Sequence, residues 1–359
     1  MNRRDFLLAL SSAVPVIASR PRPASATTTE GWRRFELRTH VEIVEPAGAT
    51  KLWLPIPLAE RTDYQRRIDL HWDAPGAAYA RRVVVPGYDV ELLWIEWPDA
   101  KAVGPVDLVA VVETRDRAVD VGESSRRAAA RQRGLEEYLR ATKLLPTDGI
   151  VKTTADEITL DRHGDIEKAR AIYEWVVEHT NRDPNVRGCG IGDVGAMLES
   201  GYLGGKCADI NGLFVALARA SAIPARDAYG VRVADSRLGY KCLGKSGDVS
   251  KAQHCRAEFY AGGHGWVPVD PADVRKVVLE ESGGLPLDDA KVVAARERLF
   301  GAWEMNWVAY NHGHDVALPG ADLKPIPYLM YPNAETRGRR LDSLDPATFK
   351  YEIHSTEVA

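Results

Sequence analysis

The sequence predicts an α+β protein in which helices pack on an antiparallel sheet, preceded by an all-β, sandwich-like domain. Between residues 32 and 114 the chain has short runs of alternating apolar residues separated by turn signals. Beyond residue 146, segments with helical periodicity come first and a strand hairpin follows. Helices followed by strands within one segment are typical of an α+β layout, in which the two meet along one buried face.

The N-terminal residues 1–26 have the pattern of a twin-arginine signal peptide. Arg3 and Arg4 precede an apolar run from Leu7 to Ala18, and Ala24-Ser25-Ala26 is a small-x-small cleavage site. The run is about twelve residues long, shorter than the roughly twenty that span a bilayer, and no later segment approaches that length. We therefore expect a periplasmic or extracellular protein, carried by the twin-arginine export machinery and without a stable membrane span. An uncleaved anchor is the alternative.

Cleavage there leaves 333 residues and removes four arginines and one aspartate, so the formal charge moves from −4 to about −7. An acidic chain of this kind is not typical of a nucleic-acid-binding protein, because binding to phosphates requires excess basic residues. The 45% hydrophobic content is that of an ordinary globular protein. Twin-arginine export carries folded proteins, so we expect a fold that does not depend on disulfides formed during threading.

An accessory β-sandwich of roughly immunoglobulin size is predicted for residues 32–114. Pro46-Ala47-Gly48 and Pro86-Gly87 are turn signals within it. The predicted strands are the five alternating runs Phe35 to Val44, Lys51 to Leu58, Tyr79 to Val85, Asp89 to Trp97 and Val106 to Glu113. Residues 115–145, rich in arginine among alanines and acids, are interpreted as a polar connector that runs into a helix.

The predicted α+β core, residues 146–284, contains two clear helices. The first covers Ile166 to His179, and Asp165 can cap its start. Its apolar stripe consists of Ala169, Ile172, Tyr173 and Val176. In the second, Ile210, Leu213, Phe214 and Leu217 recur at helical spacing, with Cys207 in the first turn. Unpaired N–H groups and the macrodipole at a helix N-terminus favour a thiolate, so Cys207 is a candidate nucleophile.

A base for this thiol is found in a predicted hairpin. Two strand-like runs, His254 to Tyr260 and His264 to Asp270, are separated by Ala261-Gly262-Gly263. If Tyr260 pairs with His264, then His254 lies opposite Asp270. Side chains directly opposed in a sheet are close enough for a carboxylate to orient an imidazole. The hairpin therefore predicts a His/Asp pair that can serve Cys207.

These motifs resemble those of the transglutaminase-like cysteine enzymes, whose fold is related to papain. The resemblance rests on three blocks: Gly205-Lys206-Cys207-Ala208-Asp209 with the later Ala222-Ile223-Pro224-Ala225-Arg226, then His254 with Glu258, and finally Gly265 to Pro271. Their order and the sixteen-residue step from histidine to aspartate fit the family. By resemblance, Cys207 is the nucleophile, His254 the general base and acid, and Asp270 the orienting acid. An inert buried thiol at Cys207 is the alternative.

Three further residues are candidates for substrate binding: Arg256, Glu258 and Trp266. The family usually has an aromatic residue two positions after the histidine, where this chain has Arg256. On a strand, Arg256 shares a face with His254 and Glu258, so it either recognises an acidic substrate group or pairs with Glu258. The backbone N–H of Cys207 is one expected oxyanion donor. No Gln or Asn precedes Cys207 at the spacing that papain-like enzymes use, so the second donor stays unassigned.

The remaining cysteines and the C-terminal residues are interpreted as structural. A bridge between Cys189 and Cys242 is conceivable in the periplasm, whereas Cys255 is interpreted as core packing. Residues 285–359 are expected to form an extension that packs on the core, because Phe300 to Tyr310 is rich in large apolar groups. The cluster His312 to Asp315 is interpreted as loop or substrate rim. No metal, no calcium loop and no other cofactor is predicted.

The function expected from these observations is cysteine-dependent acyl transfer. Attack by Cys207 on a peptide, protein or cell-envelope amide forms a thioester, which a second nucleophile resolves. Water as that nucleophile gives a peptidase or amidase, which we favour because the periplasm offers such substrates, and an amine gives a protein-glutamine transglutaminase. The alternative from another class is a non-catalytic envelope protein for binding or assembly.

Overall fold

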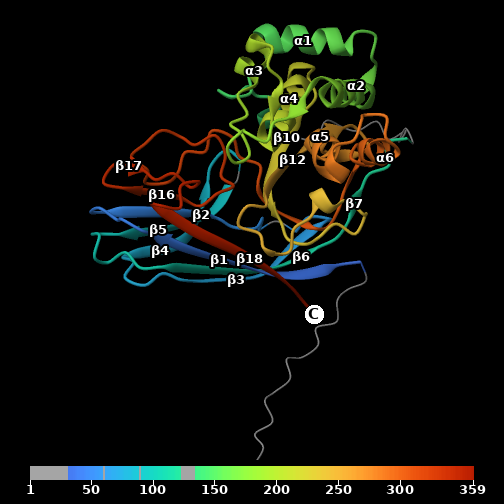
Figure 1. Ribbon diagram of the computed structural model, residues 1–359. Helices are drawn as coiled ribbons and strands as arrows, with labels where there is room; N and C mark the ends of the chain where they lie inside the picture. The colour runs from blue at the N-terminus through green and yellow to red at the C-terminus, as the bar shows by residue number, and fades with distance from the viewer. Residues whose placement is uncertain (1–30, 60, 89, 123–133) are drawn as a thin grey trace, which may run out of the picture.

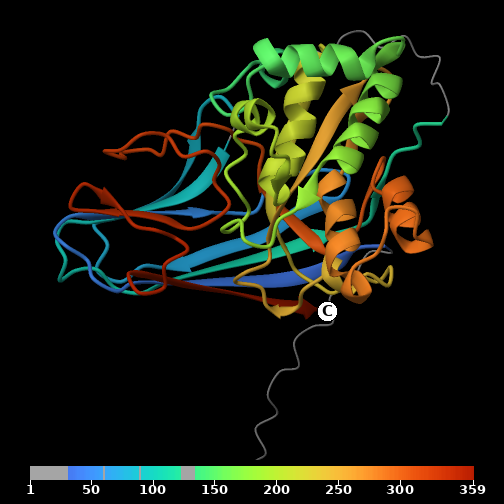
Figure 2. The ribbon, with the colours of Figure 1, turned by 45° about the horizontal axis from the view of Figure 1, so that its top comes forward.

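The computed structural model describes residues 31–59, 61–88, 90–122 and 134–359, and it combines a β-sandwich with an α+β unit (Figure 1). The proposed signal peptide, residues 1–26, and the central part of the connector, residues 123–133, lie outside the described residues. Figure 2 shows the helices gathered on one side of the molecule, with the sandwich on the other. The α+β class with a β-rich N-terminal region, predicted from the sequence, is confirmed.

The first layer of the sandwich is a five-stranded antiparallel sheet. Its strands, in spatial order, are β11 (Gly247–Asp248), β18 (Phe349–Val358), β1 (Arg33–Ile43), β6 (Val106–Thr114) and β3 (Gln65–Asp73). The last long strand of the chain therefore pairs with the first, from Arg34 beside Val358 to Ile43 beside Phe349. This pairing covers an edge of β1 that would otherwise offer unpaired backbone groups.

The second layer is also five-stranded and antiparallel, with the order β17 (Arg339–Arg340), β16 (Asn333–Thr336), β2 (Thr50–Pro55), β5 (Val90–Trp97) and β4 (Tyr79–Val85). Apolar side chains from both layers meet in one buried cluster. Val41 and Phe349 come from the first layer, whereas Leu52, Ile95 and Trp97 come from the second. β3 was not identified from the sequence, because Gln65-Arg66-Arg67 has no apolar residue and a register shift between Arg67 and Asp69 interrupts the alternation.

The α+β unit is built on a four-stranded sheet with the order β13 (Gly265–Val269), β12 (Gln253–Ala261), β10 (Ala225–Arg232) and β15 (Trp307–Asn311). Two-stranded pairs add β14 (Ala302–Trp303) beside β7 (Arg117–Ala118), and β8 (Asn181–Arg182) parallel to β9 (Gly204–Gly205). The helices are α1 (Gly149–Thr159), α2 (Gly164–His179), α3 (Val194–Ser200), α4 (Cys207–Ala220), α5 (Pro271–Glu280) and α6 (Ala290–Arg298). Short 3-10 turns cover Glu136–Tyr138, Lys241–Leu243 and Glu281–Gly283.

Helix α4 is the centre of this unit. It packs on β10 and β12 on one side and on α1, α2 and α5 on others. All of its 14 residues are buried. The predicted apolar stripe from Ile210 to Leu217 is therefore part of a helix that is enclosed on every face. The predicted stripe of α2 is also buried, although Asp165 lies in the first turn and His163 occupies the N-cap.

The hairpin of β12 and β13 forms where it was predicted, but the predicted register is wrong. Ala261 pairs with Gly265 and Tyr260 with Trp266, which shifts the pairing by two residues. The loop contains three residues, and the N–H of His264 bonds to the carbonyl of Ala261. Gly263 and Gly265 both have positive φ angles, which a glycine adopts without steric cost. β12 continues through Ala261, so the loop is Gly262 to His264 instead of the predicted Ala261 to Gly263.

The C-terminal region contributes strands to both layers of the sandwich as well as packing on the core. β16 extends the layer of β2, and β18 extends the layer of β1. Phe300 packs in the same hydrophobic cluster as α4. Across the described ranges, no helix combines the length and the apolar character that crossing a bilayer requires.

A buried ion cluster joins the connector to the core. Glu258 of β12 is fully buried between Arg226 of β10, 2.7 Å away, and Arg117 of β7. Arg117 also donates to the carbonyl of Trp266 at 2.8 Å. Burial by itself raises the pKa of Glu258, but the two guanidinium charges outweigh it and hold that pKa far below its ordinary value.

Replacing Glu258 by Gln should lower the free energy of unfolding at pH 7 by about 3–5 kcal/mol, because the buried guanidinium of Arg117 and the partly buried one of Arg226 lose their counter-charge. Since the folded-state pKa of Glu258 is depressed, its stabilisation is complete above the unfolded pKa of roughly 4.3 and is lost as the pH falls below it. The variant should therefore lose stability less steeply on acidification. Urea unfolding measured from pH 7 to pH 3 tests both effects.

The matched control is Glu45→Gln at an exposed carboxylate, which should change stability by less than about 0.5 kcal/mol. A similarly small effect in Glu258→Gln would show that this buried cluster contributes no net stability.

Candidate active site

Cys207 is the first residue of α4, and Lys206 alone separates it from the two glycines of β9. Asp209 fixes this junction, since its Oδ2 accepts the backbone N–H of Lys206 at 2.9 Å. A Cβ on Gly205 would lie 2.4 Å from the Asp209 Cβ, so only glycine permits this close approach. The glycines before the cysteine therefore make room for the acid that holds the helix start. The Cys207 side chain is only 3% exposed.

The other oxygen of Asp209 holds the loop that precedes α3. Its Oδ1 accepts the N–H of Ile191 at 3.0 Å and that of Gly192 at 2.8 Å. This loop also carries Cys189, whose carbonyl accepts the N–H of Ala208. Cys189 is thereby placed beside the first turn of α4 rather than near Cys242. All four cysteines are free thiols in the structure.

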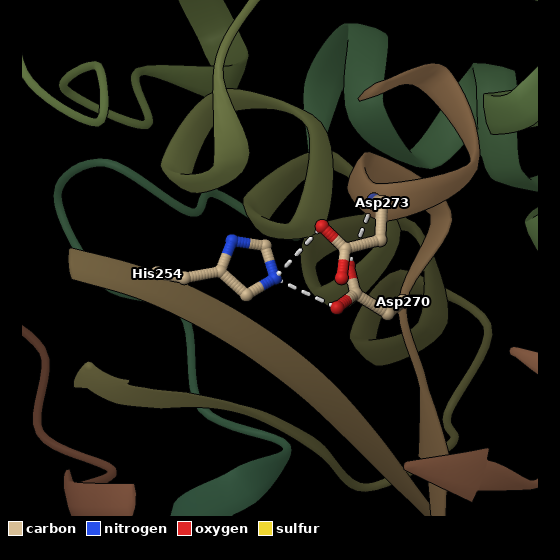
Figure 3. Close-up of side chains that lie close together, drawn as sticks. All are labelled: His254, Asp270 and Asp273. Carbon is tan, nitrogen blue, oxygen red and sulfur yellow. Dashed lines mark hydrogen bonds and ion pairs between the residues drawn. The ribbon is translucent and has the colours of Figure 1, made fainter. Parts of the chain in front are cut away.

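His254 projects from β12 toward the first turn of α5. Its Nε2 lies 2.7 Å from Oδ2 of Asp270 and 3.3 Å from Oδ1 of Asp273 (Figure 3). The other ring nitrogen, Nδ1, points away from both acids. The indole of Trp307 donates to the backbone carbonyl of His254 at 2.9 Å, which fixes the strand from the neighbouring side. The imidazole is therefore held by one nitrogen while the other is directed elsewhere in the site.

Asp270 meets His254 even though the two are not opposed strand residues. β13 ends at Val269, and Asp270 is the N-cap of α5, where its Oδ1 accepts the N–H of Asp273 at 3.0 Å. Pro271 follows at the first helical position, which suits its fixed φ. The carboxylate approaches the ring from a helix start, where N–H groups favour negative charge.

Asn211 connects the three elements of the site. Its Nδ2 donates to the Cys255 carbonyl of β12 at 2.8 Å and to Oδ1 of Asp270 at 3.2 Å, and its Oδ1 accepts the N–H of Ala272 at 3.2 Å. The side chain is completely buried. One amide thus fixes the distance between the helix that carries Cys207, the strand that carries His254 and the helix start that carries Asp270.

Two guanidinium groups balance the buried acids. Arg232 lies 2.5 Å from Oδ1 of Asp273, and Nε of Arg256 lies 3.7 Å from Oδ2 of Asp270. Both arginines are almost fully buried. Arg256 also stacks over the rings of Trp303 and Trp307, at 5.5 and 4.8 Å from their centres. Burial lowers the pKa of Arg256 to about 10, so it remains cationic at neutral pH.

The charges around His254 favour the imidazolium. Burial lowers the pKa of His254, but the carboxylates of Asp273 and Asp270 outweigh burial and the nearby Arg232, and the net shift is upward. Burial, followed by repulsion from Asp273, raises the pKa of Asp270, whereas Arg232 and His254 overcome burial at Asp273 and depress its pKa. Asp273 is therefore the more strongly anionic partner of the ring.

The surroundings of Cys207 favour the thiolate. Hydrogen bonds from the thiols of Cys189 and Cys255 and from His254 lower the pKa of Cys207 well below its ordinary value, and they outweigh the opposing effect of burial. His254 adds a favourable charge interaction. A raised histidine pKa beside a lowered cysteine pKa is the combination expected of a thiolate–imidazolium pair.

Cys207 and His254 open into a cavity of about 680 Å³. The core contributes most of the lining, and the C-terminal region adds Tyr331, Phe349 and Tyr351 among other residues. The volume is in the range that accommodates a ligand or a short peptide segment. The rim includes the exposed side chains of Lys245 and Lys251, so solvent reaches the cavity.

The three residues predicted to bind substrate do not line this cavity. The guanidinium of Arg256 contacts the carboxylate of Asp270 in the interior. Glu258 does not pair with it, because Arg117 and Arg226 are its ion-pair partners. Trp266 stacks on Arg226, with 4.0 Å between the guanidinium carbon and the ring centre. The structure thus brings Cys207, His254 and Asp270 together and separates Glu258 and Trp266 from them.

The histidines of the His312 to Asp315 segment lie in the interior. Nε2 of His314 is 2.8 Å from Oδ2 of Asp227, and Nδ1 of His312 is 2.9 Å from the Asp227 carbonyl. Burial lowers the pKa of His312 to about 3, so that ring is neutral. Neither histidine lines the cavity beside Cys207.

One group of metal-ligand side chains comes together within the part of the chain that the structure describes: His254, Asp270 and Asp273, with ligand atoms within 4.8 Å of one another. The guanidinium groups of Arg232 and Arg256 already neutralise these two acids. A divalent cation placed there would be repelled by both arginines, so the donor set does not fit a metal well.

Sequence reasoning missed Cys189, Asn211, Arg232 and Asp273, and it assigned Cys255 to core packing alone although its thiol also hydrogen-bonds to that of Cys207. Asp273 alone carried a usable signal, because Asp270-Pro271-Ala272-Asp273 has the spacing of a helix start with an acid at the third position. The other three are far apart in sequence and belong to different elements, so no local pattern links them.

The fold and these buried groups define a class of α+β cysteine proteins, and comparison with known proteins gives the family. Residues 152–271 match the family described as the transglutaminase-like superfamily. An uncharacterized protein from Haemophilus influenzae is 38% identical over 344 residues, which cover 90% of this chain and 91% of the relative. The chain belongs to the transglutaminase-like superfamily.

A solved structure has the same fold. It is a protein from Cytophaga hutchinsonii provisionally named a cysteine protease, with a TM-score of 0.56 and 14% identity over 91% of each chain.

Alkylation of Cys207 by iodoacetamide should stay fast well below pH 8, because the lowered pKa keeps the thiolate populated until the pH falls through it. Replacing His254 by Asn removes a hydrogen bond and a positive charge, so the midpoint of the pH profile should move upward. Mass spectrometry of the Cys207 peptide measures the rate. Cys242 is the internal control, because burial raises its pKa and it should react slowly at every pH tested. Equal rates for the two thiols would contradict activation of Cys207.

Replacing Asp273 by Asn should lower the pKa of His254, because Asp273 makes the largest favourable contribution to its protonated form. NMR titration of the His254 ring carbon measures the shift directly. Asp248→Asn is the comparison, since this exposed acid has no contact with the ring and should leave the titration in place. An unchanged titration in Asp273→Asn would leave Asp270 as the only acid that acts on His254.

Proposed function

We propose that this protein is an exported cysteine-dependent acyltransfer enzyme in which Cys207, His254 and Asp270 form the catalytic triad. The observation that carries the proposal is the buried His254–Asp270 contact of 2.7 Å, made by a histidine that lines the same cavity as Cys207, a thiol with a lowered pKa. Family membership supports the same assignment.

The reaction begins with attack of the Cys207 thiolate on an amide carbonyl carbon. His254, as imidazolium, gives its proton to the leaving nitrogen, the carbon–nitrogen bond breaks, and a thioester forms at Cys207. Asp270 holds Nε2 and stabilises the charged ring, so that Nδ1 faces the reaction. The backbone N–H of Cys207 is the proposed donor to the oxyanion, at the positive end of α4.

A second nucleophile then resolves the thioester, and water is the proposed one. The cavity has exposed side chains at its rim, which gives solvent access to the thioester. Neutral His254 removes a proton from water as it attacks, and the carboxylic acid and the thiolate are released. Peptides or cell-envelope amides in the periplasm are the proposed substrates. A transglutaminase would require the cleft to prefer an amine over water.

Replacing Cys207 by Ala should abolish amide cleavage, by at least about 10³-fold, because no other group supplies the nucleophile. Purified protein is assayed for ammonia release, peptide cleavage and amine incorporation in parallel. Cys242→Ala is the matched control and should keep full activity, because Cys242 does not line the cavity.

The parallel assay separates the candidate functions. Cleavage without amine incorporation supports a peptidase or amidase, and amine incorporation supports a transglutaminase. Activity that survives in Cys207→Ala would remove the proposed nucleophile, and a wild-type protein without any acyl transfer would favour a binding or assembly role.

A further inference from the structure

The cavity beside Cys207 has a charge opposite to that of the whole chain. The chain carries a formal charge of −4, yet the cavity wall has seven cationic side chains and one carboxylate, Asp248. The cationic residues of the wall are Arg182, Arg187, Lys206, Arg232, Lys245, Lys251 and Lys276. A basic pocket in an acidic protein is not a consequence of composition.

Four of the seven cations have ion-pair partners outside the cavity wall. Glu280 lies 2.5 Å from Arg182 and 3.7 Å from Lys276. The other two pairs are Arg187 with Asp342 and Arg232 with Asp273, each at 2.5 Å. These contacts hold the arginines in place and reduce their free charge.

The remaining three cations are Lys206, Lys245 and Lys251, and none of them has an ion pair within 4 Å among the described residues. Two acids interact with these lysines only weakly: Lys206 makes the smallest contribution to the lowered pKa of Asp183, and Lys245 makes the smallest contribution to that of Asp248. Asp183 is already engaged by the hydroxyl of Tyr202 at 2.7 Å, and Asp248 by Ser250 at 2.6 Å. Among the described residues, no ion pair therefore neutralises the three ammonium groups of the cavity lining.

The position of Lys206 connects this charge to the proposed chemistry. It immediately precedes Cys207, while Lys245 and Lys251 belong to the loop that leads into β12 and His254. The three cations therefore line the cavity through which an acyl donor reaches the thiol. In a cleft with low-dielectric walls, charges of one sign attract oppositely charged substrates and repel like-charged ones.

We infer that the acyl donor is anionic: a peptide or amide that carries carboxylate groups close to the bond that Cys207 attacks. This inference rests on the proposed function and names its substrate class. Lysine ammonium groups act as mobile point charges without the fixed fork of arginine, so they select for negative charge near the scissile amide rather than for one rigid geometry. The volume of about 680 Å³ accommodates a few residues of such a chain.

Iodoacetate and iodoacetamide test the inference, because both alkylate a thiolate with loss of iodide and differ in one negative charge. The rate ratio of iodoacetate to iodoacetamide at Cys207 is divided by the same ratio for free 2-mercaptoethanol. For the wild-type protein at low ionic strength this normalised ratio should be roughly 3 to 10. It should fall toward 1 in 1 M KCl, where the Debye length is about 3 Å.

A triple variant of the cavity should bring the normalised ratio close to 1; it combines Lys206→Gln, Lys245→Gln and Lys251→Gln. The matched control replaces three exposed lysines outside the cavity, Lys101, Lys152 and Lys324, with Gln and should keep the wild-type ratio. Thermal unfolding checks that both triple variants are folded. If the triple variant of the cavity does not fold, a double variant with reversed charge, Lys245→Glu and Lys251→Glu, is measured in its place. Both positions are exposed, and this double variant should lower the normalised ratio below the wild-type value. A wild-type ratio of 1, or the same ratio in the cavity and control variants, overturns the inference.

A second arm uses three peptide amide libraries that are identical except for Glu, Gln or Lys beside the scissile amide. The Glu library should be turned over fastest, and the cavity variant should lose that preference. Faster turnover of the Gln or Lys library overturns the inference while the proposed function stands. If wild-type protein turns over none of them while the iodoacetate ratio is high, the proposed function fails and the anion preference of the cleft is upheld.

Discussion

The site depends on one buried amide. Asn211 binds the backbone of β12, the carboxylate of Asp270 and the first turn of α5, while its own helix carries Cys207. A buried amide with all of these partners is costly to displace, since its partners would stay buried without a hydrogen bond. The relative placement of thiol, ring and acid is therefore fixed by the packing of α4 against the sheet, and not by any of the three residues alone.

Charge balance explains how so many ionisable groups share this interior. Asp270 and Asp273 are opposed by Arg232, Arg256 and His254, and a Cys207 thiolate would complete the balance. Isolated buried charges are expensive, but paired and hydrogen-bonded ones are tolerated. The arginine that replaces the family's usual aromatic, Arg256, has a structural explanation here, because it lies between Asp270 and the rings of Trp303 and Trp307. Substrate contact is not required to explain it.

The C-terminal segment couples the sandwich to the site. β18 closes the first layer beside β1, and the same segment supplies Phe349 and Tyr351 to the cavity. Tyr331, earlier in the segment, forms another part of the wall next to Cys189. The sandwich is therefore more than a neighbour of the core, because the strand that completes it also shapes the opening above Cys207. Changes in the sandwich far from the thiol can be expected to reach the cavity through β18.

The sequence by itself determined the elements whose signals are local: the apolar period of α2 and α4, the alternating strands of the sandwich, and the cysteine at a glycine-rich helix start. It also indicated that His254 and Asp270 meet, although by the wrong geometry. The predicted register was off by two residues because β12 continues through Ala261, so that the loop is Gly262 to His264 instead of Ala261 to Gly263. Asp270 reaches the ring from the N-cap of α5 instead. Only the tertiary structure decided that Cys189, Asn211, Arg232 and Asp273 join the site, that Glu258 and Trp266 do not line the cavity, and that β18 pairs with β1. The reason is that a period of two or 3.6 residues specifies which face of an element is buried, whereas contacts between distant segments depend on packing and charge compensation that no local pattern records.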